Sequence, residues 1–190
     1  MPATKHKSLA VVFVGEKLAG KEMASRYLIK RHRFVGYRFS KILVSILNQL
    51  NLPISRLNET NLAGALRERF GSGVLAETIK SLILDSRNQR VVIDGLRHPA
   101  ELEALKRLPG FLLVYLTAPL EVRFRRALKR RERVGEGSFS LADFKREERL
   151  PTEVFIHGLG RKAKVKLVND DGLKDLYEQI EDKIIKVYCK

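Results

Sequence analysis

Short apolar runs alternate along this chain with segments in which apolar residues recur at helical spacing. The runs predict five strands, at residues 9–14, 37–40, 91–94, 111–117 and 164–168. Helical spacing, with Gly and Pro residues at its limits, predicts helices at residues 20–30, 41–50, 58–70, 74–85, 99–107, 119–131 and 173–187. Because strands that alternate with helices need crossover connections, the sequence predicts an α/β fold with a parallel sheet and helices on its faces.

The composition fits a single folded domain. The chain has 190 residues, of which 44% are hydrophobic and 31% charged, so it is neither collagen-like nor too polar to fold. Its longest uncharged apolar stretch, near residues 110–119, is shorter than the roughly 20 residues of a membrane span, and no signal peptide is recognisable. A single cysteine, Cys189, excludes an internal disulfide. We expect a cytoplasmic monomer or small homo-oligomer with no membrane partner.

The chain is strongly basic. Its 37 Lys and Arg residues outnumber 22 Asp and Glu residues, which gives a formal net charge of +15. A surplus this large points to an anionic partner, which is a nucleic acid, a nucleotide or an acidic lipid. Seven basic residues fall within residues 123–133, and the segment 135–138 that follows is rich in glycine. We interpret residues 130–162 as an Arg-rich excursion from the sheet with a flexible joint at 135–138.

A glycine-rich motif follows the first predicted strand directly. Gly15-Glu-Lys-Leu-Ala-Gly20-Lys21 matches the pattern G-x-x-x-x-G-K and precedes a predicted helix. Glycines let such a loop turn its amide groups toward phosphate oxygens, the helix N-terminus adds positive potential, and the lysine reaches the outer phosphates. The alternative is that the two glycines are ordinary turn residues, but their place after a buried strand favours a phosphate-binding loop. The candidate nucleotide-binding residues are Gly15, Glu16, Lys17, Leu18, Ala19, Gly20, Lys21 and Glu22.

Two carboxylates are candidates for holding magnesium. Asp94 ends the strand at 91–94, where it can order the water molecules of a Mg²⁺ ion beside the loop. Glu22 stands where the motif usually has a Ser or Thr that binds the metal. Glu22 either holds a magnesium-bound water or complements the dipole in the first turn of its helix. Asp94 has the alternative role of capping the helix that follows Pro99.

Arginines at two places are candidates for binding phosphate groups. Arg97 follows the turn after Asp94, and a guanidinium there can form two hydrogen bonds to one phosphate. The alternative for Arg97 is an ion pair with Glu101 or Glu103. Arg126 and Arg130 are four residues apart, so they share one face of the predicted helix.

Several of these segments resemble nucleoside monophosphate kinases. Residues 91–97, VVIDGLR, resemble the strand and Asp-Gly-x-x-Arg turn of adenylate kinases with one residue fewer. Residues 20–22, Gly-Lys-Glu, resemble the Gly-Lys-Asp of deoxynucleoside monophosphate kinases and animal phosphomevalonate kinases. Residues 114–126, followed by Arg130, look like the strand and Arg-bearing helix that lead into the lid of such kinases, and residues 168–176 resemble their last strand and turn. Dephospho-coenzyme A kinases share much of this layout.

The resemblance implies a three-layer P-loop NTPase fold, with a five-stranded parallel sheet and helices on both faces. It also implies one kinase domain over residues 1–190, with a helical substrate-binding insertion at about 41–86 and an Arg-rich lid at about 125–162. In such an enzyme the 15–21 loop and Lys21 hold the phosphates of ATP, and Asp94 organises Mg²⁺. The arginines that it assigns to the acceptor phosphate or to the transferring phosphoryl group are Arg38, Arg67, Arg97, Arg126 and Arg130.

These features predict an ATP-dependent phosphotransferase with Mg²⁺ as its cofactor. The expected acceptor is a small phosphate-bearing molecule, a nucleoside or deoxynucleoside monophosphate. One alternative is an enzyme like dephospho-coenzyme A kinase. A second alternative, which the basic composition keeps open, is a P-loop ATPase that acts with RNA or DNA.

Overall fold

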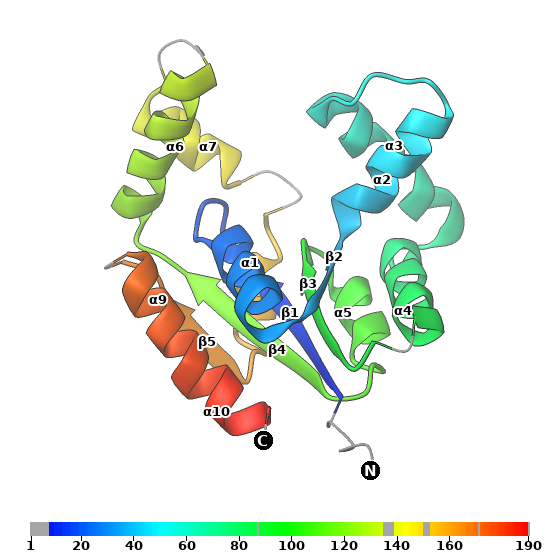
Figure 1. The fold of residues 1–190 in the computed structure, drawn as a ribbon. Coiled ribbons are helices and arrows are strands. Elements are labelled where there is room, and N and C mark those ends of the chain that lie inside the picture. The colour runs from blue at the N-terminus through cyan, green and yellow to red at the C-terminus, as the bar shows by residue number, and fades with distance from the viewer. Residues whose placement is uncertain (1–7, 87, 135–138, 150–152, 171, 190) are drawn as a thin grey trace.

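The computed structural model describes residues 8–86, 88–134, 139–149, 153–170 and 172–189. A five-stranded sheet lies at its centre, with the strand order β2-β3-β1-β4-β5 (Figure 1). All four pairings between neighbouring strands are parallel, which confirms the predicted α/β class and the five-stranded parallel sheet. The strands are β1 (Leu9–Val14), β2 (Val35–Arg38), β3 (Arg90–Asp94), β4 (Phe111–Thr117) and β5 (Val165–Val168).

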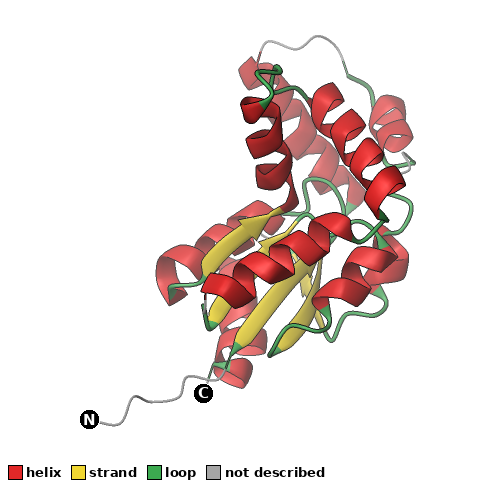
Figure 2. Ribbon diagram, turned by 90° about the vertical axis from the view of Figure 1, so that its right-hand side faces the viewer, coloured by secondary structure: helices red, strands yellow, loops and turns green. Residues whose placement is uncertain are grey.

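Helices cover both faces of the sheet (Figure 2). The helices are α1 (Lys21–His32), α2 (Phe39–Gln49), α3 (Arg56–Phe70), α4 (Val74–Ser86), α5 (Pro99–Leu105), α6 (Leu120–Val134), α7 (Leu141–Glu147), α8 (Ile156–Gly160), α9 (Leu173–Ile180) and α10 (Lys186–Tyr188). A π-helical turn, η1 (Glu181–Ile185), joins α9 to α10, so the predicted helix at 173–187 is not α-helical throughout. The predicted joint at 135–138 lies outside the described residues.

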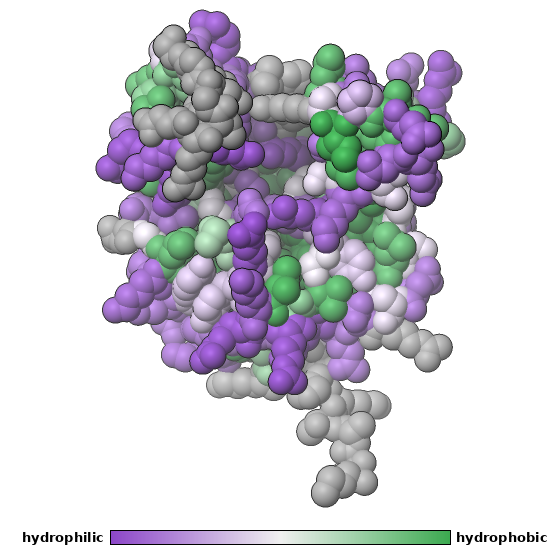
Figure 3. All heavy atoms as spheres, turned by 45° about the horizontal axis from the view of Figure 1, so that its top comes forward, coloured by the Kyte–Doolittle hydropathy of each residue, from purple (hydrophilic) through white to green (hydrophobic). Residues whose placement is uncertain are grey.

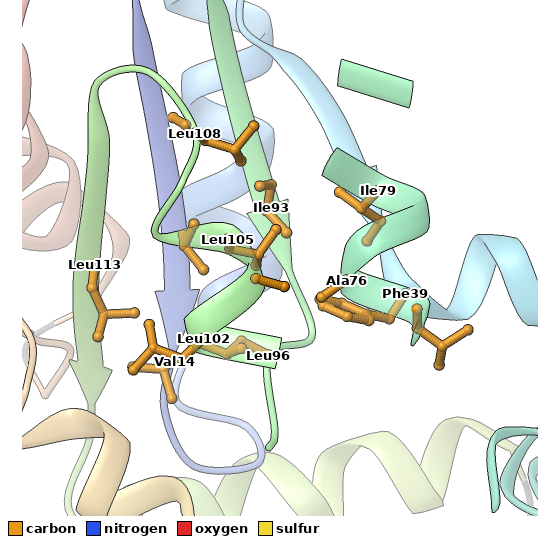
Figure 4. Close-up of a cluster of buried hydrophobic side chains, with 14 of the residues drawn as sticks. Val14, Phe39, Ala76, Ile79, Ile93, Leu96, Leu102, Leu105, Leu108 and Leu113 are labelled. Atoms are coloured by element: carbon orange, nitrogen blue, oxygen red, sulfur yellow. The ribbon is translucent and has the colours of Figure 1, made fainter. Parts of the chain in front are cut away.

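The central strand β1 is buried on both faces because its side chains alternate between two apolar clusters. Val12 and Val14 pack in one cluster with residues of α4 and α5, and Val11 and Phe13 pack in the other with residues of α1 and α9. Figure 4 shows part of the first cluster, where Leu102 of α5 lies beside Val14. A strand that is covered on both sides has no polar face, which is why the run at 9–14 is apolar without interruption.

The edge strand β2 begins and ends two residues before its predicted position. The prediction of strand at residues 37–40 is wrong for Phe39 and Ser40, which begin α2. Phe39 is buried and lies in the same apolar cluster as Leu43, one helical turn further along. The helical repeat of buried positions therefore starts at Phe39, and the strand ends at Arg38.

Two helical arms rise from the carboxyl edge of the sheet (Figure 1). One arm consists of α2 and α3, and the other of α6 and α7. In the α6–α7 arm the fully buried ring of Phe144 packs against Phe124, with ring centroids 5.8 Å apart, and lies beneath the guanidinium of Arg123. Arg123 also pairs with Glu148 just after α7, so α7 is attached to α6 by both apolar and charged contacts.

Candidate functional site

A cleft of about 1030 Å³ opens at the carboxyl edge of the sheet, with residues of both arms in its walls. Figure 3 looks toward this edge, where hydrophilic side chains gather between the two arms. The cleft brings together every side chain that the sequence predicted for catalysis, acceptor binding or metal. These residues are Lys21, Glu22, Arg38, Arg67, Asp94, Arg97, Arg126 and Arg130.

The 15–21 loop connects β1 to α1 at one end of the cleft. Leu18 and Gly20 have φ angles of 63° and 111°, so the backbone turns through the left-handed region twice. A Cβ atom on Gly15 would lie 1.9 Å from the carbonyl oxygen of Leu116, and one on Gly20 would lie 2.2 Å from Nδ2 of Asn169. Both glycines are therefore required by close packing, and neither is an interchangeable turn residue.

Lys21 is held inside the curve of this loop. Its Nζ donates hydrogen bonds to the carbonyl oxygens of Gly15 at 2.7 Å and Glu16 at 2.8 Å. Burial lowers the pKa of Lys21 from 10.5 to about 8, because the ammonium has lost water and has gained only neutral carbonyls, although Asp94 opposes the shift. An anion bound in the loop would therefore favour the charged form of this lysine.

The side chain of Glu16 points away from the cleft and is buried behind the loop. Its Oε1 accepts a hydrogen bond from the hydroxyl of Tyr115, and no described residue pairs with its Oε2. Burial and this carboxylate raise the pKa of Tyr115 to about 12. Ala19 is also buried. Of the candidate nucleotide-binding residues, the cleft is lined by Lys17, Leu18, Gly20, Lys21 and Glu22, and not by Gly15, Glu16 or Ala19.

Arg126 and Arg130 share a helix face, but the structure gives them different surroundings. Arg126 donates to the carbonyl oxygen of Leu18 at 3.1 Å and to Oδ1 of Asn169 at 3.0 Å. Asn169 in turn donates from Nδ2 to the carbonyl oxygen of Ala19 at 2.8 Å. Arg126 thus contacts the backbone of the 15–21 loop and Asn169. Arg130 is exposed at the cleft and forms no ion pair with any side chain that the structure describes.

The two candidate metal ligands share one arginine. Nη2 of Arg38 lies 3.6 Å from Oδ2 of Asp94 and 3.6 Å from Oε1 of Glu22. Glu22 also accepts a hydrogen bond from Arg26 at 2.8 Å. Within the described ranges, no group of three or more His, Cys, Asp and Glu side chains could hold a metal. Mg²⁺ needs only one or two carboxylates when substrate phosphates complete its shell, so Asp94 fits this ion and Glu22, occupied by arginines, fits it less well.

A fully buried carboxylate, which the sequence suggested only as an alternative partner of Arg97, organises the other end of the cleft. Oε1 of Glu101 accepts a hydrogen bond from Nη2 of Arg67 at 2.8 Å, and Oε2 accepts from the backbone amides of Arg97 at 2.9 Å and His98 at 3.0 Å. A single side chain, that of Glu101, therefore fixes both the guanidinium of Arg67 and the backbone turn after Asp94. His98 and Glu101 form a capping box at the start of α5, and their spacing in the sequence was the signal that could have indicated this role of Glu101.

This arrangement corrects two alternatives that the sequence left open. The cap of α5 is His98, whose Nδ1 accepts a hydrogen bond from the amide of Ala100 at 3.2 Å, and not Asp94. The guanidinium of Arg97 does not pair with Glu101, which binds only the Arg97 backbone. It pairs with Glu153, beyond α7, and this contact between residues 56 apart has no local signal in the sequence.

A second carboxylate near the end of the α6–α7 arm makes a similar contact at the loop end of the cleft. Glu147, the last residue of α7, forms an ion pair with Lys17 of the 15–21 loop. The cleft is thus bordered by two basic residues, Lys17 and Arg97. Lys17 pairs with Glu147 at the end of the α6–α7 arm, and Arg97 pairs with Glu153 in the segment that follows this arm. Any anion that uses these two cations has to compete with Glu147 and Glu153.

The fold resembles those of several kinases of known structure. The shikimate kinase of Bacteroides thetaiotaomicron superimposes with a TM-score of 0.59 over 94% of this chain and 97% of its own, at 13% sequence identity. The shikimate kinase of Acinetobacter baumannii, in complex with shikimate, gives a TM-score of 0.57 over 97% of both chains at 19% identity. A gluconokinase of Sinorhizobium meliloti gives 0.52 over 97% and 95% at 13% identity. At these identities the likeness establishes the architecture alone.

Sequence relatives are more similar but match only part of the chain. A UPF0200 protein of Methanosarcina mazei is 34% identical over 122 residues, which are 63% of this chain and 65% of that protein. A UPF0200 protein of Methanothermobacter thermautotrophicus is 35% identical over 85 residues, 44% of each chain. The chain therefore spans less than two thirds of the relative from M. mazei. No family model matches the chain.

No helix in the described part of the chain combines the length and the apolar character that crossing a membrane would require.

Proposed function

We propose that this protein transfers the γ-phosphoryl group of ATP to a small phosphate-bearing acceptor, a nucleoside or deoxynucleoside monophosphate. The observation that carries the proposal is the distribution of cations in a single cleft. Lys21 and the 15–21 loop occupy one end, and Arg67 and Arg97, both fixed by Glu101, occupy the other. A donor and an acceptor that each bring phosphate would meet between them.

The donor end suits a nucleoside triphosphate. Two glycines let the 15–21 loop pack tightly against Leu116 and Asn169, which fixes its curve around Lys21. The charge of Lys21 is poorly compensated without an anion, because burial has removed water from it. Arg126 and Asn169 brace the loop from outside through its carbonyl groups. Asp94 is the residue that would hold Mg²⁺, which when bound would neutralise charge on the phosphates.

The acceptor end combines cations with an apolar wall. Arg38, Arg67 and Arg97 line it, and guanidinium groups suit phosphate because they offer paired donors in a plane. The exposed Phe155 lines the same region, and its ring offers aromatic surface to a flat ring such as a nucleobase. We assign this role to the α2–α3 arm and its neighbour α4, within the proposed insertion at residues 41–86, and the role of a lid to residues 125–162.

Transfer would need alignment and charge neutralisation more than a base. An oxygen of the acceptor phosphate attacks the γ-phosphorus of ATP, a new O–P bond forms, and the bond from the γ-phosphorus to its bridging oxygen breaks with the electron pair remaining on ADP. A phosphate dianion has no proton to lose, so no general base is required. Lys21 and the exposed Arg130 would neutralise charge as it moves, while Arg126 keeps the loop in place.

An acceptor panel tests the proposal. We would measure ADP formation from Mg-ATP with ribo- and deoxynucleoside monophosphates, dephospho-coenzyme A, shikimate and gluconate. We expect one nucleoside monophosphate to raise ADP formation well above the rate without acceptor. In Arg97→Ala the KM for that acceptor should rise at least about tenfold with little change in the KM for ATP, since a charge-assisted hydrogen bond contributes about 1.5–3 kcal/mol. Arg107→Ala, which removes an exposed arginine outside the cleft, is the matched control.

The panel also separates the alternatives. Activity with dephospho-coenzyme A alone would replace the proposed acceptor with that molecule, and activity with shikimate or gluconate would indicate a carboxylate-bearing acceptor. No ADP formation with any member of the panel would refute the proposal. The net charge of +15 favours a second candidate, an ATPase that acts with RNA or DNA. Salt-sensitive binding to RNA or DNA, together with ATP hydrolysis raised by that nucleic acid and unaffected by monophosphates, would support it.

A further inference from the structure

We propose that Glu153 occupies the place of the acceptor's phosphate on Arg97 and is displaced from it when the acceptor binds. Glu153 would thus be a built-in competitor that sets the affinity of this end of the cleft for anions. This inference rests on the proposed function only in identifying the anion as the acceptor's phosphate. The competition itself concerns two side chains and any phosphate ion.

The geometry places Glu153 inside the cleft and not at its rim. Its side chain is 10% exposed and that of Arg97 is 29% exposed, and the two form an ion pair. Both residues line the cleft together with Lys21, and Glu153 is among the carboxylates that oppose the lowered pKa of Lys21. A carboxylate so close to Lys21 and Arg97 lies where the two phosphate-bearing substrates would meet. Because like charges repel, Glu153 and a bound acceptor phosphate cannot both remain beside Arg97.

Glu153 differs from Glu101 in that it is able to leave. Glu101 is fully buried and accepts three hydrogen bonds, so removing it from Arg67 would strand several donors without partners. The side chain of Glu153 has one hydrogen-bond partner among the described residues, the guanidinium of Arg97, and Glu153 belongs to the segment that follows the α6–α7 arm. Glu101 is therefore a permanent support of the arginines, and Glu153 is an exchangeable ligand of one of them.

Charge determines which anions would drive the exchange. A carboxylate that replaces Glu153 leaves the charge beside Arg97 unchanged, and a free ligand also loses translational freedom that a tethered side chain does not lose. A phosphate brings a charge of about −1.5 to −2 at pH 7 and can accept two parallel hydrogen bonds from one guanidinium. We therefore expect phosphate to displace Glu153 and a simple carboxylate at the same concentration to displace it poorly.

The test uses inorganic phosphate and acetate as probes of the full-length protein. In ¹⁵N-labelled protein the Nε–Hε signal of Arg97, identified by its loss in Arg97→Lys, reports on this site alone and not on the 15–21 loop. We would titrate each anion at constant ionic strength. In the native protein phosphate should move this signal and equal acetate should not. In Glu153→Gln the dissociation constant for phosphate at Arg97 should fall about tenfold, and acetate binding should become measurable.

Two variants with the same change of charge control for long-range electrostatics. Glu59→Gln removes a carboxylate that lines the same cleft without pairing with Arg97, and Glu147→Gln breaks the other ion pair of the arm, with Lys17. Each should change the dissociation constant at Arg97 by less than about twofold. If either matches Glu153→Gln, or if Glu153→Gln leaves phosphate binding unchanged, Glu153 is not a specific competitor and the inference is wrong.

Turnover gives an independent readout once an acceptor is known. In Glu153→Gln the KM for the acceptor should fall while kcat is not reduced. A fall in kcat with the loss of a titration from its pH profile would overturn the inference, because Glu153 would then be accepting a proton from a hydroxyl acceptor. If the acceptor panel shows no activity, the competition between Glu153 and phosphate is still tested by the titration. If the titration shows no competition, the proposed reaction is still tested by the acceptor panel.

Discussion

Replacing Lys21 by Met should change the way in which stability depends on pH. The ammonium of Lys21 has exchanged water for two neutral carbonyl oxygens, which lowers its pKa from 10.5 to about 8. A difference of this size corresponds to about 3 kcal/mol of unfavourable free energy in the folded state. Since Lys21 keeps part of its surface exposed to the cleft, solvent screening reduces the expected figure to about 2 kcal/mol.

The sign follows from the two protonation equilibria. Below about pH 8 Lys21 is charged in both the folded and the unfolded chain, and the folded protein bears the whole penalty. As the pH rises from 8 to 10.5 the folded protein loses this proton before the unfolded chain does, so the penalty disappears. The native protein should therefore gain stability relative to Lys21→Met over this interval. Neutral lysine still donates hydrogen bonds, so the contacts with the loop carbonyls persist.

Urea unfolding at a series of pH values measures the effect. The quantity to follow is the free energy of unfolding of Lys21→Met minus that of the native protein, because titrations common to both proteins cancel. This difference should decrease by about 2 kcal/mol between pH 7.5 and 10.5 and stay constant below pH 7.5. A difference that does not vary with pH would refute the reasoning, since Lys21 would then have an ordinary pKa in the folded protein.

Three further predictions concern other parts of the site. Gly15→Ala should destabilise the fold by about 3 kcal/mol in urea unfolding, because the added Cβ would meet the carbonyl of Leu116, whereas Gly158→Ala, with open space around it, should be neutral or slightly stabilising. Glu101→Gln should raise the KM for the acceptor about tenfold without changing the KM for ATP, and an equal change in both would contradict its assignment to one end of the cleft. Arg130→Ala should lower kcat by about 10³ with ATP affinity retained, as expected of a cation that acts on the transferring group, and a loss confined to ATP binding would contradict this role.

The strands at the centre of the sheet were predictable because a strand buried on both faces appears in the sequence as a continuous apolar run. The predicted ranges 9–14 and 111–117 coincide with β1 and β4, both of which are largely apolar runs. Strand β2 was predicted two residues too late, because it is short, lies at the sheet edge and has little buried surface to mark it. The boundary between β2 and α2 lies at Phe39. An aromatic residue suits both the end of a strand and the start of a helix, so the sequence alone does not place this boundary.

The location of the site was also predictable, but the environment of its side chains was not. The motif at 15–21 and the residues that end β3 lie at the carboxyl edge of a parallel sheet, where they necessarily come together. By contrast, the surroundings of Arg126 and Arg130 differ because the carbonyls of the 15–21 loop lie beside Arg126. The partners of Lys17 and Arg97 lie 130 and 56 residues away, so that no local pattern could indicate them.

These contacts show that some of the basic residues in the cleft are neutralised by carboxylates and others are not. Arg67, Arg97 and Lys17 form ion pairs with carboxylates, whereas the hydrogen bonds that Lys21 and Arg126 form with described residues go to carbonyl oxygens. A carbonyl satisfies a donor without cancelling its charge, so the charge of Lys21 is not neutralised by an ion pair with any side chain that the structure describes. An anion that enters the loop gains the attraction of Lys21 at once, but at Arg97 it must first replace a carboxylate. On the proposed assignment, the donor end should therefore bind phosphate more readily than the acceptor end, and ATP should bind before the acceptor.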